Sequence, residues 1–192
     1  MRRPAQPFLV TLATLEEGAN RVRLEGSAEE LGIAPAEAEI EGAVVLEGFL
    51  YRAEARVEVQ ARVLAVALQV CDRCAAPIRQ PIDAEMRLLC EKKGERDRRS
   101  DAESRAEDSG LLYHDGRTLD LREEIREAVL LEVPWHPLCS PDCRGLCPRC
   151  GTNRNEGDCG CPPRRGTAPW DALSRMVGGV EPSPPDTSRG KE

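Results

Sequence analysis

Apolar residues recur at every second position through the first half of the chain, a pattern typical of half-buried antiparallel strands. The clearest stretch is 55–67, where every second residue is Ala or Val and the positions between them begin as Arg, Glu and Gln. A similar alternation covers 44–51 and resumes over 78–90, after a turn that contains two cysteines. The pattern predicts an α+β, β-rich fold whose body is an antiparallel meander, with a small closed or half-closed barrel as the alternative.

Shorter elements flank this body. Residues 8–12 and 21–25 are predicted to be short strands, and 27–32 a brief helical turn. Apolar residues at helical spacing predict an amphipathic helix over 118–133, in which Asp120 caps the start with Glu123 as its reciprocal partner. Pro134 ends that helix, and a second short helix is expected over 170–177.

The composition changes abruptly along the chain, and these changes predict its domains. Residues 91–110 are almost wholly charged and cannot bury apolar surface. The last residues contain several prolines among polar residues, which predicts a disordered end. The predicted units are a β-rich body (1–93), a charged flexible linker (94–110), a strand and amphipathic helix packing on the body (111–137), a zinc-binding module (138–178) and a disordered tail (179–192).

Nine cysteines stand in the chain, and most of them fall in one short segment. The motif Cys147-Pro-Arg-Cys150-Gly151 has the spacing with which two thiolates grip one tetrahedral ion, and a glycine after the second cysteine lets backbone amides turn toward sulfur. In a protein expected to be cytoplasmic, clustered thiols favour metal ligation over disulfides. The candidate metal ligands are Cys139, Cys143, Cys147, Cys150, Cys159 and Cys161, together with Cys71 and Cys74 as further candidates.

The spacing leaves the sharing of ions open. The partners of Cys147 and Cys150 are either Cys159 and Cys161, or one of those two with a cysteine from the start of the segment. Adding the Cys71–Cys74 pair makes eight thiols, which is enough for two four-cysteine ions, and Cys90 is then left over. One or two structural zinc ions are therefore expected, because sites with only thiolate ligands are usually closed.

The sequence favours structural zinc over two other uses of these thiols, an iron–sulfur cluster and redox chemistry. An iron–sulfur cluster also takes four cysteines, but the motif Cys-Pro-x-Cys-Gly favours zinc. A redox role for Cys71 and Cys74 requires a lowered thiol pKa, typically at a helix N-terminus, and the sequence around them predicts a hairpin turn instead. His136 lies three residues before Cys139 and is interpreted as a surface residue, while His114 has no evident partner.

Net charge and aromatic content limit the kinds of partner that this protein is expected to bind. The net charge of −7 argues against binding RNA by bulk attraction, and an aromatic content of 3% argues against an exposed stacking sheet. The cysteine-rich segment is richer in arginine, and we expect Arg144, Arg149 and Arg154 to contact phosphate. No apolar run is long enough for a membrane span, so a cytoplasmic protein without a membrane partner is expected.

Several blocks, in this order, resemble one family. Val70-Cys-Asp-Arg-Cys-Ala-Ala-Pro-Ile78 is followed by the helix segment 119–134, the cysteine-rich segment 138–161 and Pro169-Trp-Asp-Ala-Leu173. This order is similar to that of the YceD family, bacterial and plastid proteins linked to accumulation of large-subunit ribosomal RNA. The resemblance implies a cytoplasmic, non-catalytic accessory factor in large-subunit biogenesis, without a small-molecule substrate.

The sequence is also compatible with two other functions. The first is a protein-interaction module that binds a ribosomal protein without RNA contact, which the negative charge favours because ribosomal proteins are basic. The second is a thiol redox enzyme that uses Cys71 and Cys74. The partner expected from the resemblance is ribosomal RNA, a large-subunit ribosomal protein or an assembly intermediate.

Overall fold

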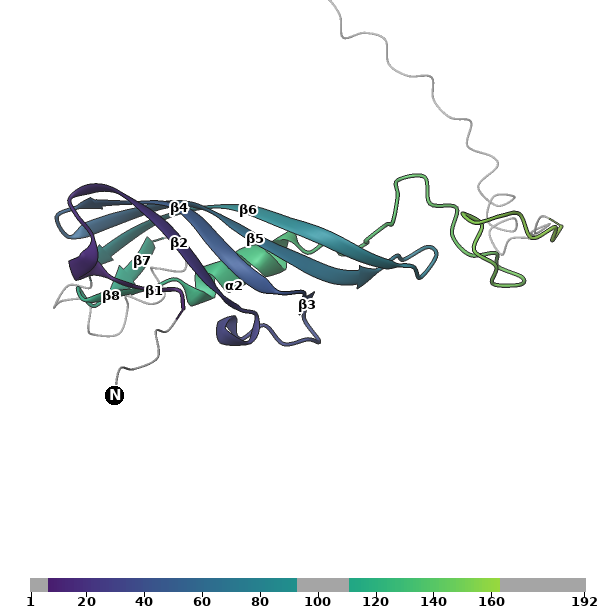
Figure 1. The fold of residues 1–192 in the computed structure, drawn as a ribbon, viewed down its shortest axis with the longest axis horizontal. Coiled ribbons are helices and arrows are strands. Elements are labelled where there is room, and N and C mark those ends of the chain that lie inside the picture. The colour runs from purple at the N-terminus through teal and green to yellow at the C-terminus, as the bar shows by residue number, and fades with distance from the viewer. Residues whose placement is uncertain (1–6, 93–110, 163–192) are drawn as a thin grey trace, which may run out of the picture.

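The alternating segments form one curved sheet that bends around a single helix (Figure 1). The structure, a computed structural model, describes residues 7–92 and 111–162. Its elements, in chain order, are β1 (Leu9–Thr11), the 3₁₀ turn η1 (Leu12–Thr14), β2 (Gly18–Ser27), the 3₁₀ turn η2 (Glu29–Leu31), β3 (Glu39–Ile40), β4 (Ala43–Ala53), β5 (Arg56–Val70), β6 (Pro77–Lys92), β7 (Leu111–His114), β8 (Thr118–Asp120) and α2 (Arg122–Glu132).

The main sheet has the order β2-β4-β5-β6-β7, with β3 paired to the far half of β5. Its strands are antiparallel except for β7, which runs parallel to β6, and β1 and β8 form a separate two-stranded sheet. The predicted antiparallel meander is confirmed. The closed form of the barrel alternative is wrong: in the part of the chain that the structure describes, β2 and β7 are opposite edges and the sheet stays open.

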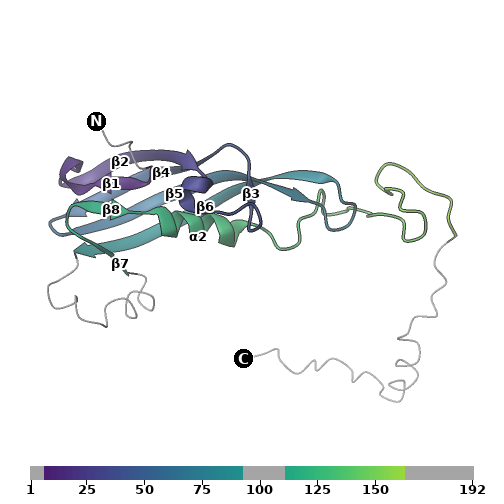
Figure 2. The same cartoon turned by 90° about the horizontal axis from the view of Figure 1, so that it is seen from below.

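The helix α2 covers much of the apolar face of the open sheet (Figure 2), and the small β1–β8 sheet adds Val10 and Leu119 to the same core. The residues that alternate inward along β4 and β5, such as Leu46, Val59 and Val63, are fully buried. On α2, Ile125 and Val129 are also fully buried, and the helix packs on β5 and β6. The inward residues of the strands and the apolar residues of α2 therefore pack together in one core.

The helix begins later than the sequence predicts. Residues Thr118–Asp120 are strand β8, because Leu119 pairs with Val10 of β1 and is fully buried. The capping box predicted for Asp120 and Glu123 is wrong in detail, since no side chain caps the helix at its N-cap residue. The carboxylate of Asp120 instead accepts a hydrogen bond from the backbone N–H of Arg122 at 3.1 Å. Pairing with β1 thus outweighs local helix propensity over these residues.

The predicted helical turn at 27–32 forms as η2, and it carries a reciprocal pair of hydrogen bonds. The carboxylate of Glu30 accepts from the backbone N–H of Ser27 at 2.8 Å, and the Ser27 hydroxyl accepts from the N–H of Glu30 at 3.2 Å. The linker predicted at 94–110, the second helix at 170–177 and the tail at 179–192 lie outside the described residues. Within the described ranges, no helix has the length and apolar character needed to cross a bilayer.

Candidate metal centres

Strands β5 and β6 continue beyond the rest of the sheet as a two-stranded ribbon, and the turn at its tip carries two cysteines (Figure 1). The N–H of Cys71 donates to the carbonyl of Ala76 at 2.8 Å, and the N–H of Ala75 donates back to the carbonyl of Cys71 at 2.8 Å. Ala75 adopts the left-handed conformation, with φ of 56°. This tight turn brings the side chains of Cys71 and Cys74 to one side of the hairpin tip.

The chain after α2 docks on this tip through backbone groups. The N–H of Asp72 donates to the carbonyl of Pro137 at 3.0 Å, and the N–H of Leu146 donates to the carbonyl of Arg73 at 2.9 Å. The Arg73 guanidinium donates to the carbonyl of Cys143 at 2.9 Å. These contacts place a segment from far along the sequence against the turn between β5 and β6.

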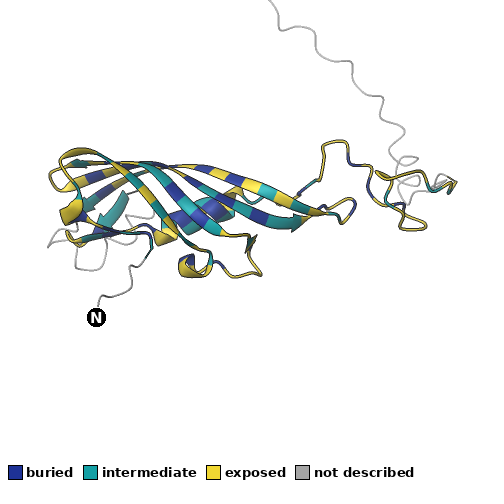
Figure 3. Ribbon diagram, viewed as in Figure 1, coloured by how far each residue is buried: buried dark blue, intermediate teal, exposed yellow. Residues whose placement is uncertain are grey.

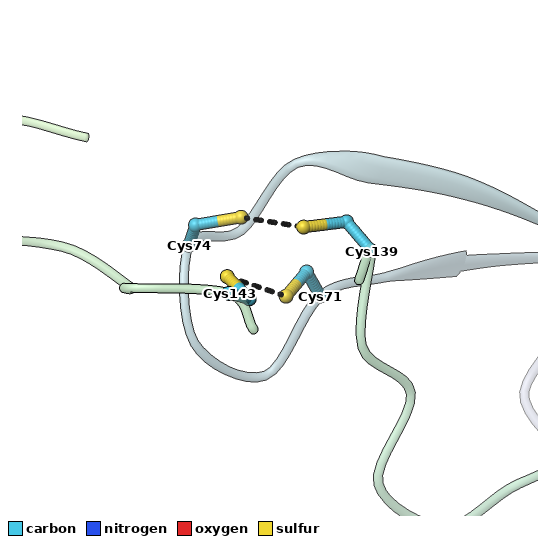
Figure 4. A group of neighbouring side chains, drawn as sticks. All are labelled: Cys71, Cys74, Cys139 and Cys143. Carbon is cyan, nitrogen blue, oxygen red and sulfur yellow. Dashed lines mark hydrogen bonds between the residues drawn. The ribbon is translucent and has the colours of Figure 1, made fainter. Parts of the chain in front are cut away.

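Docking gathers four thiols, Cys71, Cys74, Cys139 and Cys143, which we term the hairpin cluster (Figure 4). Their sulfur atoms all lie within 4.8 Å of one another. The Cys71–Cys143 pair is 3.7 Å apart and the Cys74–Cys139 pair 3.5 Å. Four sulfurs at the usual Zn–S distance of about 2.3 Å from a tetrahedral ion are about 3.8 Å apart. The cluster could therefore hold a metal ion.

A second group of four thiols, Cys147, Cys150, Cys159 and Cys161, forms the distal cluster, whose sulfur atoms also lie within 4.8 Å of one another. The N–H of Gly151 donates to the carbonyl of Cys147 at 2.9 Å, and Gly151 has a φ of 74°. The sulfur of Cys150 lies 3.2 Å from the hydroxyl oxygen of Thr152. The distal cluster could hold a metal ion as well.

The same turn is therefore used twice. In both Cys71–Ala75 and Cys147–Gly151, the residue after the second cysteine has a positive φ and returns its N–H to the carbonyl of the first cysteine. A Cβ on Gly145, which also has a positive φ, would lie only 2.9 Å from the carbonyl oxygen of Arg73, so this glycine permits the close approach of the two segments. The two Cys-x-x-Cys spacings in the sequence indicate this repeated turn. It is harder to recognise at Cys71–Ala75 because alanine stands there where the second turn has glycine.

Ionisation within each cluster is uneven. Hydrogen bonds from backbone N–H groups, first that of Cys139, lower the pKa of Cys71 to about 6, whereas neighbouring thiols, first Cys143, raise the pKa of Cys139 to about 12. In the distal cluster the Thr152 hydroxyl lowers the pKa of Cys150 to about 6, and neighbouring thiols raise the pKa of Cys161 to about 12. Four thiolates this close repel one another, and a divalent cation would relieve that repulsion.

Asn155 connects the two clusters. Its side-chain N–H donates to the sulfur of Cys143 at 3.2 Å, and its side-chain oxygen accepts from the backbone N–H of Arg144 at 2.7 Å. Asn155 itself belongs to the loop between the two cysteine pairs of the distal cluster. With a metal ion bound to the hairpin cluster, its hydrogen bond would help to orient the Cys143 ligand.

The remaining cysteine and both histidines of the chain lie outside the two clusters. Cys90 is fully buried in the sheet core, and burial raises the pKa of its thiol to about 12. The Nδ1 atom of His136 lies 2.9 Å from a carboxylate oxygen of Asp72, so the histidine faces the hairpin tip without joining the cluster. His114 is buried, with its ring nitrogens hydrogen-bonded to the carbonyl of Ala55 and the N–H of Gly116.

The three arginines proposed for phosphate contact differ in their surroundings. The guanidinium of Arg144 lies 2.6 Å from the carboxylate of Asp158. Arg149 and Arg154 line a hollow beside the distal cluster, and among the described residues neither forms an ion pair. Arg144 is therefore partly neutralised, whereas the other two keep their charge available.

These features define a class of protein: an open antiparallel sheet backed by one helix, with two four-cysteine clusters that could hold metal ions at the end of a long hairpin. The chain belongs to the YceD family, since residues 59–176 match the family model described as "Large ribosomal RNA subunit accumulation protein YceD". The match includes most of β5 and every cysteine of both clusters.

The chain is similar to curated proteins of mycobacteria and plants, and the plant proteins carry the family name. An uncharacterized protein of Mycobacterium tuberculosis (strain H37Rv) is 33% identical over 125 residues, which cover 62% of this chain and 58% of that protein. The Zea mays protein named "Large ribosomal RNA subunit accumulation protein YCED homolog 1, chloroplastic" is 39% identical over 49 residues, 25% of this chain and 17% of that protein. The chain thus spans little more than half the length of its mycobacterial relative. No solved structure matches the chain significantly.

Proposed function

We propose that this protein is a cytoplasmic, non-catalytic accessory factor in large ribosomal subunit biogenesis, which promotes accumulation of large-subunit ribosomal RNA. The observation that carries the proposal is the family match over residues 59–176, because it extends from β5 through the helix to both cysteine clusters. The named plant relatives support it, since their names state the same role.

The cofactor in this proposal is zinc, with one ion in each cluster. Both clusters offer four sulfur ligands and no oxygen or nitrogen ligand, which suits zinc, and four-thiolate zinc sites are closed and structural. The hairpin cluster then joins the tip of the β5–β6 ribbon to the chain beyond α2, and the distal cluster folds a segment too small for a core of its own. The ligands proposed are the eight cysteines of these clusters, and Cys90 is left out.

Depletion of the protein in its host is expected to lower the ratio of large-subunit to small-subunit ribosomal RNA, and a plasmid-borne copy should restore it. The ratio is read from total RNA by electrophoresis and from ribosomal particles by sucrose-gradient sedimentation. An unchanged ratio and particle profile after complete depletion would contradict the proposed function.

The same complementation tests the proposed phosphate contacts. A copy with Arg144→Glu, Arg149→Glu and Arg154→Glu should restore the ratio poorly and lose association with ribosomal particles, because three basic groups become acidic. A control copy with Glu54→Gln, which changes an acidic residue in the turn between β4 and β5, should complement fully. Full complementation by the charge-reversed copy would remove these arginines from the proposed site.

A second candidate is a module that binds a basic ribosomal protein without RNA contact. The net charge of −7 favours it, because strongly basic partners are attracted to an acidic surface. The two candidates separate in one pull-down: association with particles or ribosomal proteins that survives nuclease treatment supports the protein partner, and association that is lost supports RNA.

A further inference from the structure

The face of the sheet that points away from α2 carries two exposed aromatic side chains. Exposed and buried positions alternate along the strands of this sheet (Figure 3). Phe49 is 44% exposed and Tyr51 37% exposed, and they stand two residues apart on β4, so both point outward. Their ring centroids are 6.1 Å apart, with 33° between the ring planes. The chain has only six aromatic residues, so placing two of them side by side in solvent calls for an explanation.

The strand register shows what surrounds these rings. Phe49 lies opposite Arg21 of β2 on one side and Gln60 of β5 on the other, and Gln60 lies opposite Arg87 of β6. One row across four strands is therefore Arg, Phe, Gln, Arg. We term these four residues and Tyr51 the outer platform. β4 is hydrogen-bonded to strands on both sides, so the platform is rigid before any partner arrives.

The arginines on this face fall into paired and unpaired groups, and the acidic residues Glu58 and Glu85 of the same face form no ion pair with the residues that the structure describes. Most arginines of the face are neutralised: Arg23 pairs with Glu47, Arg56 with Glu91, and Arg62 with Asp83. The structure records no ion pair for Arg21 or Arg87 with any residue it describes. The two unpaired cations thus stand at the two ends of the row that contains Phe49, as anionic phosphates on either side of a stacked base would require.

The sequence of β4 has a matching pattern. In RNA-binding sheets of the RRM type, a central strand reads Lys/Arg-Gly-Phe/Tyr-Gly/Ala-Phe, with its alternate aromatics stacking on bases. Here the strand reads Gly48-Phe49-Leu50-Tyr51, which keeps the glycine and both outward aromatics. Glu47 replaces the basic residue that begins the pattern, and the cations come instead from the neighbouring strands β2 and β6.

We propose that the outer platform binds single-stranded RNA, with bases stacked on Phe49 and Tyr51 and phosphates contacted by Arg21 and Arg87. The choice of RNA rests on the proposed function, and the stacking geometry comes from the sheet itself. Gln60, between Phe49 and Arg87, offers an amide to base edges, although it also donates to Glu58 at 2.6 Å. The low aromatic content argues against such a surface. Phe49 and Tyr51 nevertheless support one, because they lie next to each other on the outer face of the sheet.

The test is fluorescence anisotropy of the full-length protein with a labelled, mixed-sequence RNA of about twelve nucleotides, compared with the same sequence as a duplex. The wild-type protein should bind the single strand more tightly than the duplex. A Phe49→Ala/Tyr51→Ala variant should bind the single strand at least about 25-fold more weakly, counting about fivefold for each lost stacking contact. Equal binding by wild type and variant, or no binding by wild type, overturns the proposal.

Matched variants separate stacking from other causes. Trp135 is 93% exposed and lies beyond α2, so Trp135→Ala removes an exposed aromatic without touching the platform and should leave binding unchanged. Phe49→Leu/Tyr51→Leu keeps apolar surface without aromatic faces and should still bind RNA weakly. Full RNA affinity in that leucine variant would show that binding does not use the aromatic faces and would overturn the proposal. Glu58→Gln should tighten RNA binding, whereas a basic protein partner would bind this variant less well.

The platform and the proposed function fail in different ways. If depletion lowers large-subunit ribosomal RNA and Phe49→Ala/Tyr51→Ala complements fully, the platform proposal fails and the function stands. If depletion leaves the ribosomal RNA ratio unchanged, the function fails, whatever the RNA affinity of the purified protein. Loss of both RNA binding and complementation in a variant of unchanged thermal stability supports the platform.

Discussion

Replacing Cys71 and Cys74 together by serine is expected to release residues 137–146 from the hairpin tip while the sheet stays folded. The hairpin cluster joins residues 65 positions apart, such as Cys74 and Cys139. Structural zinc supplies about 10–16 kcal/mol of apparent binding free energy in zinc-finger peptides, whereas a hydrogen bond contributes about 0.5–1.5 kcal/mol. The few hydrogen bonds of the docked segment cannot replace the binding free energy of the proposed zinc ion.

Native-state hydrogen exchange measures this release. The amides of Asp72 and Leu146, which donate across the junction, should lose protection in the double serine variant, while the amide of Val59 in the centre of the sheet should keep it. Cys90→Ala is the control, because it removes a buried cysteine that belongs to neither cluster and should leave the junction protected. Unchanged exchange at both junction amides would contradict the account.

Phe8→Ala is expected to lower the free energy of unfolding by about 3–5 kcal/mol, the range for buried Phe-to-Ala changes. Phe8 is fully buried, and its carbonyl accepts the N–H of Leu121 at 3.1 Å, next to the start of α2. Its ring occupies the space where a Cβ on Gly26 would stand, at 2.5 Å from one ring carbon. Truncating it therefore leaves a cavity between β2 and the β8–α2 junction.

The matched control for this loss is Phe49→Ala, the same substitution at a residue that is 44% exposed. It should cost less than about 1 kcal/mol, because an exposed strand position loses little packing. Urea denaturation of both variants gives the two values. Similar losses in both would contradict the assignment of Phe8 to the core and of Phe49 to a free surface.

Hydrophobic periodicity predicted the sheet well, because alternation fixes which face of each strand is buried. The pattern 55–67 becomes β5, and its buried positions are the alanines and valines named from sequence. Two errors came from contacts distant in sequence. Pairing with β1 turns Thr118–Asp120 into a strand, and the main sheet stays open between its edge strands β2 and β7.

The cysteine clusters and the outer platform could be predicted only in part, because both depend on which distant segments of the chain come together. The sequence supplied eight candidate thiols, yet spacing alone could not assign Cys139 and Cys143 to the hairpin tip, because this depends on how the chain after α2 returns to β5 and β6. The low aromatic content likewise led the sequence analysis away from the outer platform. Composition counts residues, whereas the register of β2, β4, β5 and β6 determines which of them meet.

The most direct test of the account is elemental analysis of the protein purified without added metal, giving zinc, iron and acid-labile sulfide per chain. The account predicts two zinc ions per chain and neither iron nor sulfide, and one zinc ion in the Cys71→Ser/Cys74→Ser variant. Two zincs in that variant would remove the hairpin cluster from the ligand set. Iron with sulfide, or a folded wild-type protein without metal, would contradict the assignment of the clusters to structural zinc.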